Sequence, residues 1–261
     1  MITNETVEKG SLPIVSKEEK VRDNCMKLYT YLVTLSIPDF SNRASREKGR
    51  RQFQQKDFTL NKIHTILGMD AKTIKKYWQQ LELDGLVKYV GGAPIDKNLT
   101  WEKNFMARKK YPEGYYHIDR PEKFRKIPKD TVTKILQEYL VSELELKIYL
   151  MLGNVQEYYY NKGGVQNIQI TYKDLIVLLG MKNEKQNRVA IKKALVWLKE
   201  IGLIVFEQDK RKAGNFNFEV ECINLIQVNF YIDPANTSID NSDCELISLQ
   251  DKEEIIKISL E

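Results

Sequence analysis

The feature that most limits the fold is a segment that occurs twice. Residues 59–69, TLNKIHTILGM, and residues 171–181, TYKDLIVLLGM, share one pattern of polar, apolar and glycine positions. Each is followed by a second stretch of helical periodicity, at 74–81 and 191–198, and then by Gly-Leu and a β-branched run. The sequence therefore predicts a unit of helix, turn, helix and strand that is repeated once along the chain.

Apolar spacing indicates which face of each helix is buried. The expected stripes are Ile63, Ile66, Leu67, Ile74, Tyr77, Trp78 and Leu81 in the first copy, and Leu175, Leu178, Leu179, Ile191, Ala194, Leu195 and Leu198 in the second. Gly68 permits the left-handed backbone of a tight turn, and Asp70 can cap the next helix. Trp197, roughly 120° from the second stripe, either packs against the wing or a neighbouring helix or is partly exposed as a protein interface.

Glycines at the ends of the second helices predict small antiparallel wings. Gly85 and Gly202 stand where each helix should stop. The predicted wing strands are 86–90 with 114–118, and 203–206 with 216–223; the second wing turns at 210–215 and pairs with a short strand at 165–170. We therefore expect an α+β fold of two tandem winged helix-turn-helix domains, predominantly helical with small antiparallel wings.

Length and composition fit two small domains. A chain of 261 residues with 42% apolar content can bury two cores of ordinary size. The expected parts are a flexible N-terminus (1–15), a first domain (16–120), a linker bracketed by prolines (121–128), a second domain (129–232) and an acidic tail (233–261). Capping boxes predict helices from Ser16 to about Leu35 and from Ser142 to about Tyr160, the latter preceded by a helix at about 130–139.

Two segments interrupt this regular pattern. Residues 41–53 are rich in arginine and too polar for a core, so we expect a basic loop. Residues 91–113 form a long excursion between the strands of the first wing and include Trp101 and Phe105. This excursion is either an enlarged wing or an insertion packed back on the domain.

Formal charge is unevenly distributed. The chain carries +5 overall, but residues 233–261 hold eight acids against two lysines, a net of −6, which leaves +11 for residues 1–232. A basic body of this kind favours a polyanionic partner. An ordinary solvated helix surface would explain either set of helix lysines alone, but the same pattern found twice beside a wing favours double-stranded DNA.

Candidate DNA contacts follow from the expected free faces and basic turns. They are Lys72, Thr73, Lys75, Lys76 and Gln79; Lys185, Asn187, Arg188 and Lys192; Lys210, Arg211 and Lys212; Arg43, Arg46, Arg50 and Arg51; and Arg108, Lys109 and Lys110. Lysine and arginine supply phosphate contacts, whereas Thr73, Gln79, Asn187 and Arg188 can contact base edges. Because Gly68 and Gly85 are 17 positions apart and Gly180 and Gly202 are 22 apart, the copies should contact different base pairs.

Patterns typical of enzymes are missing from the sequence. The two histidines, His64 and His117, are far apart, and no phosphate-binding loop ending in Gly-Lys-Ser/Thr occurs. The three cysteines are widely spaced and suit buried thiols in a reducing compartment: Cys25, Cys222 and Cys244. Three tyrosines at 158–160 stand at a helix end, where packing is expected. We predict a binding protein without catalytic residues, metal or cofactor.

The motifs also carry a resemblance to a known family. They are Leu67, Gly68 and Met69 with Gly85 and Leu86, and Leu179, Gly180 and Met181 with Gly202 and Leu203. Over about residues 16–232 the chain resembles plasmid replication initiators of the iteron-binding type, and its composition is similar to that of replication proteins of low-GC Gram-positive plasmids and phages, including DnaD-like initiation proteins. The resemblance implies binding of direct repeats at an origin, local duplex opening, recruitment of host helicase machinery, and a dimer that represses its own promoter.

Three hypotheses follow for the function. The leading one is a sequence-specific replication initiator that binds double-stranded DNA. The second is a transcriptional regulator that uses the same contacts, and the third is a protein–protein adaptor built on winged domains. Because no apolar stretch approaches the ~18 residues of a membrane span and the N-terminus lacks a signal pattern, we expect a bacterial cytoplasmic protein without a membrane partner.

Overall fold

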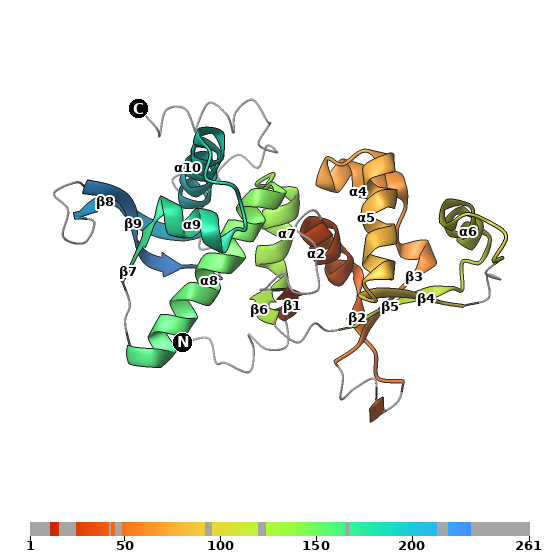
Figure 1. The fold of residues 1–261 in the computed structure, drawn as a ribbon. Coiled ribbons are helices and arrows are strands. Elements are labelled where there is room, and N and C mark those ends of the chain that lie inside the picture. Colours follow the sequence, from red (N-terminus) through yellow and green to blue (C-terminus); the bar gives the residue numbers. More distant parts are fainter. Residues whose placement is uncertain are drawn as a thin grey trace. The chain divides into compact units, whose positions relative to one another are not determined.

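The chain divides into two compact units, residues 1–137 and 138–261 (Figure 1). The computed structural model describes residues 11–15, 25–41, 43–44, 49–91, 96–119, 124–164, 167–212 and 219–230. Each unit combines helices with small antiparallel sheets, so the expected α+β class is confirmed. The division falls later in the chain than the linker predicted at 121–128.

Unit 1 carries a four-stranded sheet and a separate strand pair. Its elements are β1 (Ser11–Val15), α2 (Met26–Leu35), β2 (Ile37–Pro38), β3 (Arg51–Gln54), η2 (Gln55–Asp57), α4 (Leu60–Leu67), α5 (Ala71–Leu83), β4 (Val87–Val90), α6 (Trp101–Ala107), η3 (Arg108–Lys110), β5 (Tyr115–Ile118), β6 (Phe124–Pro128) and α7 (Lys129–Gln137). The sheet order is β2-β3-β5-β4, and β1 pairs with β6; both sheets are antiparallel.

The described residues of unit 2 include a three-stranded antiparallel sheet. Its elements are α8 (Glu143–Gly163), β7 (Ile168–Thr171), α9 (Tyr172–Leu178), α10 (Lys185–Glu200), β8 (Ile204–Lys212) and β9 (Glu219–Val228). The sheet order is β7-β9-β8. The predicted capping box of α8 is confirmed, because Ser142 and Glu145 exchange hydrogen bonds at its start.

The two units share one order of elements. In unit 1 it is α2, β3, α4, α5, β4 and β5, and in unit 2 it is α8, β7, α9, α10, β8 and β9. In both, the first strand of the series pairs with the last, which also pairs with the strand between them in sequence. Unit 1 contains an additional helix, α6, between the two strands of its hairpin.

Buried lysines hold the turn between the paired helices in both units. Lys27 of α2 donates from Nζ to the carbonyl oxygen of Leu67 at 3.1 Å, and Lys147 of α8 donates to that of Leu179 at 2.7 Å. Both carbonyls belong to the last turn before the inter-helix glycine, where helix carbonyls lack a partner within the helix. Helices α2 and α8 therefore stabilise the helix-turn-helix of their units by the same contact.

Tyrosines two residues further along tie the same helices to the end of the sheet. Tyr29 Oη donates to the carbonyl oxygen of Asp119 at 3.3 Å, and Tyr149 Oη donates to that of Asn229 at 2.8 Å. Asp119 and Asn229 directly follow β5 and β9. The repeat seen in the sequence is thus a repeat of buried polar contacts as well as of apolar spacing.

The predicted turns between the paired helices are confirmed. Gly68 and Gly180 have φ of 66° and 64°, the left-handed region that glycine adopts without strain. Asp70 caps α5 by accepting hydrogen bonds from the backbone amides of Lys72 and Thr73, both at 2.9 Å. Local sequence therefore determines where α5 begins, whereas the start of α10 at Lys185 has no side-chain cap.

Burial follows most of the predicted stripes, with Ile66 and Tyr77 half-buried. Trp197 is fully buried and donates from Nε1 to the carbonyl oxygen of Tyr139 at 3.0 Å, so the packing alternative is confirmed. The reason is that α10 contacts both α8 and β8, which buries more than one stripe. On α9, Leu178 is exposed and Ile176 is buried instead, so that part of the predicted stripe is wrong.

Three segments predicted to lack regular structure form strands. Ser11–Val15 pairs with Phe124–Pro128, although these were expected to be a loose terminus and a linker. Arg51–Gln54, in the predicted basic loop, is a strand whose Phe53 is buried and stacked on Tyr116 at 5.0 Å between ring centroids. Sheet pairing is a contact between distant segments, so local polarity does not reveal it.

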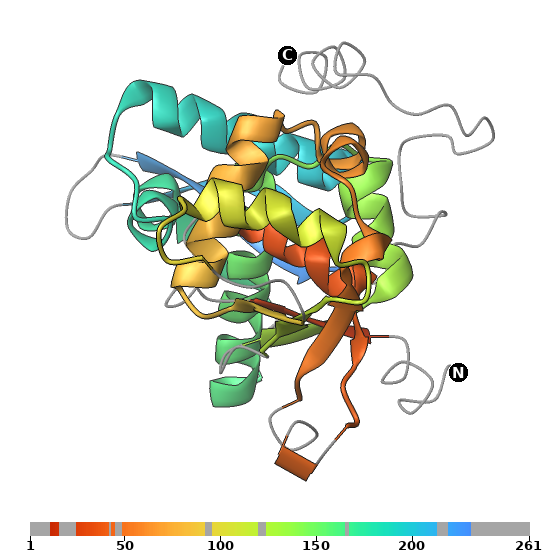
Figure 2. The same ribbon diagram turned by 90° about the vertical axis from the view of Figure 1, so that its right-hand side faces the viewer.

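Several further expectations are corrected. The three tyrosines at 158–160 are exposed rather than packed, because the end of α8 extends beyond the sheet (Figures 1 and 2). Strand β8 continues to Lys212, through the start of the turn predicted at 210–215. Cys25 and Cys222 are buried, as expected. The capping box at Ser16 and the third cysteine, Cys244, lie outside the described residues.

Candidate nucleic-acid interface

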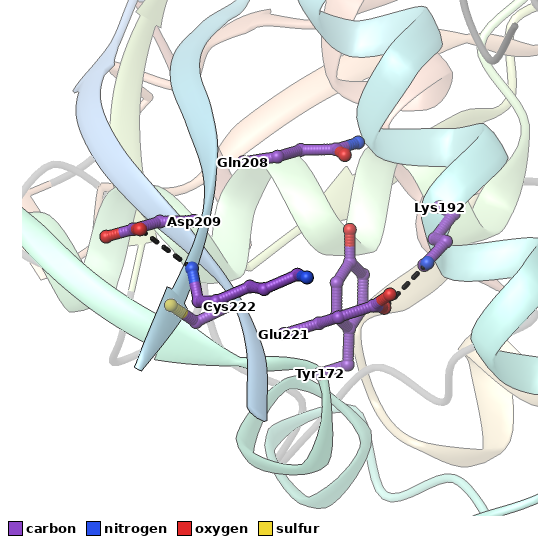
Figure 3. Close-up of a pocket in the computed structure, with 7 residues that line it drawn as sticks. Tyr172, Lys192, Gln208, Asp209, Glu221 and Cys222 are labelled. Atoms are coloured by element: carbon purple, nitrogen blue, oxygen red, sulfur yellow. Dashed lines mark hydrogen bonds and ion pairs between the residues drawn. The ribbon is translucent and has the colours of Figure 1, made fainter. Parts of the chain in front are cut away.

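The strongest grouping of candidate residues lies in unit 2, where α10 meets the β8–β9 hairpin. Lys192 of α10 donates from Nζ to Glu221 Oε2 of β9 at 2.7 Å (Figure 3). The same ammonium lies 5.1 Å from the ring centroid of Tyr172, the first residue of α9. Lys210 stands directly opposite Glu221 in the β8–β9 register. One carboxylate therefore pairs with a helix lysine and lies across the hairpin from a second lysine.

Electrostatics identify a third cation in this group. The hydrogen bond and the charge of Lys192 hold the pKa of Glu221 below its usual value, and the charges of Lys210 and Arg188 lower it further. Arg188, Lys192 and Lys210 were predicted separately from the sequence. The structure brings all three into the field of one acidic residue that the sequence reasoning missed.

A small pocket lies beside this group. Its volume is about 140 Å³, below the roughly 300 Å³ at which pockets for organic ligands begin. It is lined by Tyr172, Lys192, Gln208, Asp209, Lys210, Glu221 and Cys222 (Figure 3). Burial, with smaller contributions from Glu221 and Cys222, raises the pKa of Tyr172 to about 12, so its hydroxyl stays protonated at neutral pH. The pocket suits water and small ions rather than a nucleotide.

The start of α10 carries the candidate base-contacting residues of unit 2. Arg188 donates from Nε and Nη2 to Asn183 Oδ1 at 3.0 and 2.9 Å, and Asn187 donates from Nδ2 to the carbonyl oxygen of Lys182 at 2.8 Å. Both therefore fold back on the longer turn that distinguishes this copy. Lys185, the first residue of α10, is exposed.

In unit 1 the corresponding helix face is partly covered. Lys75 of α5 forms an ion pair with Glu102 of α6, and Glu82 of α5 accepts a hydrogen bond from Trp101 Nε1 at 2.7 Å. Lys75, Gln79 and Glu82 share one face of α5 by their i, i+4 and i+7 spacing. Helix α6 therefore lies against the face that was predicted to be free, and Figure 2 shows it in front of α5.

Arg108 fixes this insertion to the domain. It is only 6% exposed, donates from Nη1 and Nη2 to the two carboxylate oxygens of Glu82, and lies 4.7 Å from the ring centroid of Tyr89. The alternative of an insertion packed back on the domain is thus confirmed. Arg108 is not available to DNA in this arrangement, whereas its neighbours Lys109 and Lys110 are exposed.

The remaining candidates of unit 1 are distributed. Lys72 and Lys76 are exposed on α5, and the Thr73 hydroxyl donates to Asp70 Oδ2 at 2.6 Å, which makes Thr73 part of the helix cap. These positions surround the start of α5, away from Glu82. The accessible part of the predicted face is therefore its N-terminal half.

The predicted basic loop contributes less than expected. Arg50 forms an ion pair with Asp119 at 2.7 Å, and Arg51 donates to Ser36 Oγ and to the Ser36 carbonyl oxygen at 2.8 and 2.6 Å. Burial lowers the pKa of Arg51. Its guanidinium is used to bind Ser36, the residue just before β2. Arg43 is exposed.

Other predicted positions fall wholly or partly outside the description. Arg46 lies among residues that the structure does not describe, and Arg211 and Lys212 are described only as backbone of β8. Neither Glu102 nor Glu221 was singled out from the sequence. Glu221 could have been found, because the alternation of side chains along a strand places it across from the basic wing turn.

Neither a metal site nor a match to a known protein indicates what this surface binds. Among the described residues, no group of three or more histidine, cysteine, aspartate and glutamate side chains is placed to hold a metal ion. Within the same part of the chain, no helix combines the length and the apolar character needed to cross a membrane. Searches of protein-family models, curated proteins and solved structures find no match to this chain.

Proposed function

We propose that the protein binds double-stranded DNA with sequence specificity. The observation that carries this proposal is the convergence of Arg188 and Lys192 of α10 with Lys210 of β8 around Glu221. A helix and an adjacent hairpin that present cations together suit a major groove and its flanking phosphates. Arg188 and Asn187, at the start of α10, are the candidates for base contacts.

We infer that each unit is a winged helix-turn-helix domain. The repeated order of elements, the left-handed glycine between the paired helices and the hairpin after the second helix support this interpretation. On this basis α5 and α10 are the recognition helices, and the β4–β5 and β8–β9 hairpins are the wings. Because α6 covers part of α5, α10 supplies most of the base contacts and unit 1 contacts chiefly phosphates through Lys72 and Lys76.

The biological role that we propose is replication initiation of a plasmid or phage inside a bacterial cell. Two tandem DNA-binding units whose recognition helices differ suit direct repeats at an origin. Host replication proteins would be recruited to that origin. Footprinting on the plasmid or phage genome at about 150 mM salt tests this role, because nonspecific phosphate binding is then weak. Protection of tandem direct repeats supports it, a single inverted repeat over a promoter indicates a regulator, and no discrete footprint contradicts DNA recognition and favours the adaptor.

Replacement of single residues tests the interface directly. Arg188→Ala should weaken binding to the protected site by about tenfold, as expected for loss of a base contact. Lys192→Ala should reduce the slope of log affinity against log salt concentration by about one, as expected for loss of one phosphate contact. Lys199→Ala is the matched control, because Lys199 lies in the last turn of the same helix. Equal effects of Arg188→Ala and Lys199→Ala would exclude the start of α10 as the base-contacting surface.

A further inference from the structure

The second helices of the two units carry a lysine at one equivalent position. Ile74 and Ile191, both fully buried, are 117 residues apart, and so are Gly85 and Gly202. The backbone amide after each of these glycines donates to the helix at the same distance of 2.9 Å. The same offset relates Lys75 of α5 to Lys192 of α10.

Each of these lysines is paired with a carboxylate from a different element. Lys75 pairs with Glu102, which belongs to the helix inserted in the first hairpin, and Lys192 pairs with Glu221, which belongs to the last strand of unit 2. The two acids do not occupy equivalent places in the repeat. One lysine position has thus acquired an acidic partner by two unrelated routes.

In both pairs the carboxylate side chain is more exposed to solvent than the lysine side chain. The side chains of Glu102 and Glu221 are 60% and 61% exposed, whereas those of Lys75 and Lys192 are 24% and 35% exposed. An anion that approaches either lysine from solvent therefore meets the carboxylate first. At Glu221 the same negative charge also offsets those of Lys210 and Arg188.

We propose that Glu102 and Glu221 act as internal competitors for the DNA backbone. In the free protein each carboxylate occupies the place of a phosphate oxygen at its lysine, and on binding the phosphate replaces the carboxylate, which turns to solvent. This inference rests on the proposed DNA-binding function. The lysine keeps an anionic partner throughout, so each contact adds less affinity than an unpaired lysine would.

The exchange lowers affinity without changing the preference between sequences. Binding to non-target DNA depends almost wholly on phosphate contacts, whereas binding to a target also gains from base contacts. A phosphate contact made in both complexes is weakened by the same factor in both, so the ratio of the two affinities is unchanged. The two glutamates therefore reduce the affinity for DNA of any sequence, and the base contacts alone determine the preference.

Charge-removing substitutions test the proposal in the full chain. Glu102→Gln and Glu221→Gln should each tighten binding to a fluorescent mixed-sequence duplex of about 30 base pairs, by about two- to fivefold at about 150 mM salt, the range expected for exposed ion pairs. Glu207→Gln on β8 is the matched control, since Glu207 is exposed and lies opposite Asn224 rather than a lysine. It should leave the affinity nearly unchanged.

A double-mutant cycle separates exchange at the lysine from a general change of charge. In a Lys192→Gln background, Glu221→Gln should tighten binding clearly less than it does in the wild type, because only its effect on Lys210 and Arg188 then remains. Tightening of the same size in both backgrounds, or weaker binding by Glu221→Gln alone, would overturn the proposal. The second result would identify the pair as a support for the hairpin.

The wild-type protein distinguishes failure of this inference from failure of the proposed function. If it protects a discrete site while the glutamine variants bind as it does, the competitor role is wrong and DNA recognition stands. If neither the wild type nor any variant binds the duplex, both proposals fall. Unfolding midpoints of the variants confirm that each retains the fold.

Discussion

At the scale of single residues, many charges in unit 1 are neutralised within the unit. Arg108 meets Glu82, Arg50 meets Asp119, and Lys75 meets Glu102. These pairs differ in burial, and burial determines their energetic weight, because a solvent-exposed pair contributes little while a buried charge without its partner is costly.

Arg108→Met should destabilise the protein by about 3 kcal/mol, since it leaves the Glu82 carboxylate near the core without its cation. Lys109→Met, at the exposed neighbouring position, should change the stability by less than about 0.5 kcal/mol. Urea unfolding followed by tryptophan fluorescence measures both. Similar midpoints for the two variants would show that the Arg108 contact does not support α6.

His117 should titrate below its ordinary pKa of 6.5, because burial and the charge of Arg50 disfavour the protonated ring more than Asp39 favours it. The unfolded chain then binds the proton more readily than the folded one. The stability contributed by a neutral His117 is therefore complete above about pH 6.5 and is lost as the pH falls through the folded value.

Proton NMR of the imidazole measures this pKa, with His64→Gln assigning the two histidine signals. A His117→Gln variant should show a flatter dependence of stability on pH over the same window. A His117 pKa above 6.5 would mean that Asp39, 3.6 Å from the imidazole nitrogen, dominates its environment.

At the scale of elements, local rules located several helix starts and turns from the sequence. Gly68 and Asp70 locate the turn before α5, and the box of Ser142 and Glu145 locates the start of α8, because glycine conformation and capping depend on a few neighbouring residues. The strands at Ser11–Val15 and Arg51–Gln54 were missed because their stability comes from partners far along the chain.

The same distinction explains which candidate site residues were placed correctly. Helical spacing identified Lys192 as a surface residue of α10, but its partner Glu221 is 29 residues away and required the sheet register. Helical spacing also left the face of Gln79 free, and only the packing of the insertion shows that α6 lies against it. Pairwise contacts across elements carry information that periodicity does not.

The covering of α5 by α6 predicts unequal roles for the two second helices. Gln79→Ala should change the affinity for the footprinted site by less than about twofold, whereas Asn187→Ala should lower it by about tenfold, the cost of a lost base contact. Titration of each variant against the same site measures both values. A larger loss for Gln79→Ala would mean that α6 moves away from α5 when DNA binds.

At the scale of the whole molecule, charge asymmetry is the dominant property. Residues 233–261 have a net charge of −6 and the rest of the chain +11. On the proposed DNA partner these charges would act over about a Debye length, so their influence would depend on ionic strength more than on contact geometry.

Removal of residues 233–261 should tighten binding to a mixed-sequence duplex, and more at about 50 mM salt than at about 200 mM, because screening reduces the repulsion between the acidic segment and phosphate. Removal of residues 1–10, which changes the formal charge by one unit, is the control for shortening the chain. An equal effect at both salt concentrations would contradict an electrostatic origin.

The contacts of the two Lys-x-Tyr triplets, at residues 27–29 and 147–149, have a consequence for ancestry. Loss of either side chain leaves a buried polar group without its partner, which makes stepwise replacement costly. After a gene duplication, such residues should outlast the surface chemistry that diverges around them. A sparse search pattern of Lys-x-Tyr, then Leu-Gly-Met, then Gly-Leu should therefore find remote kin that overall similarity does not reveal.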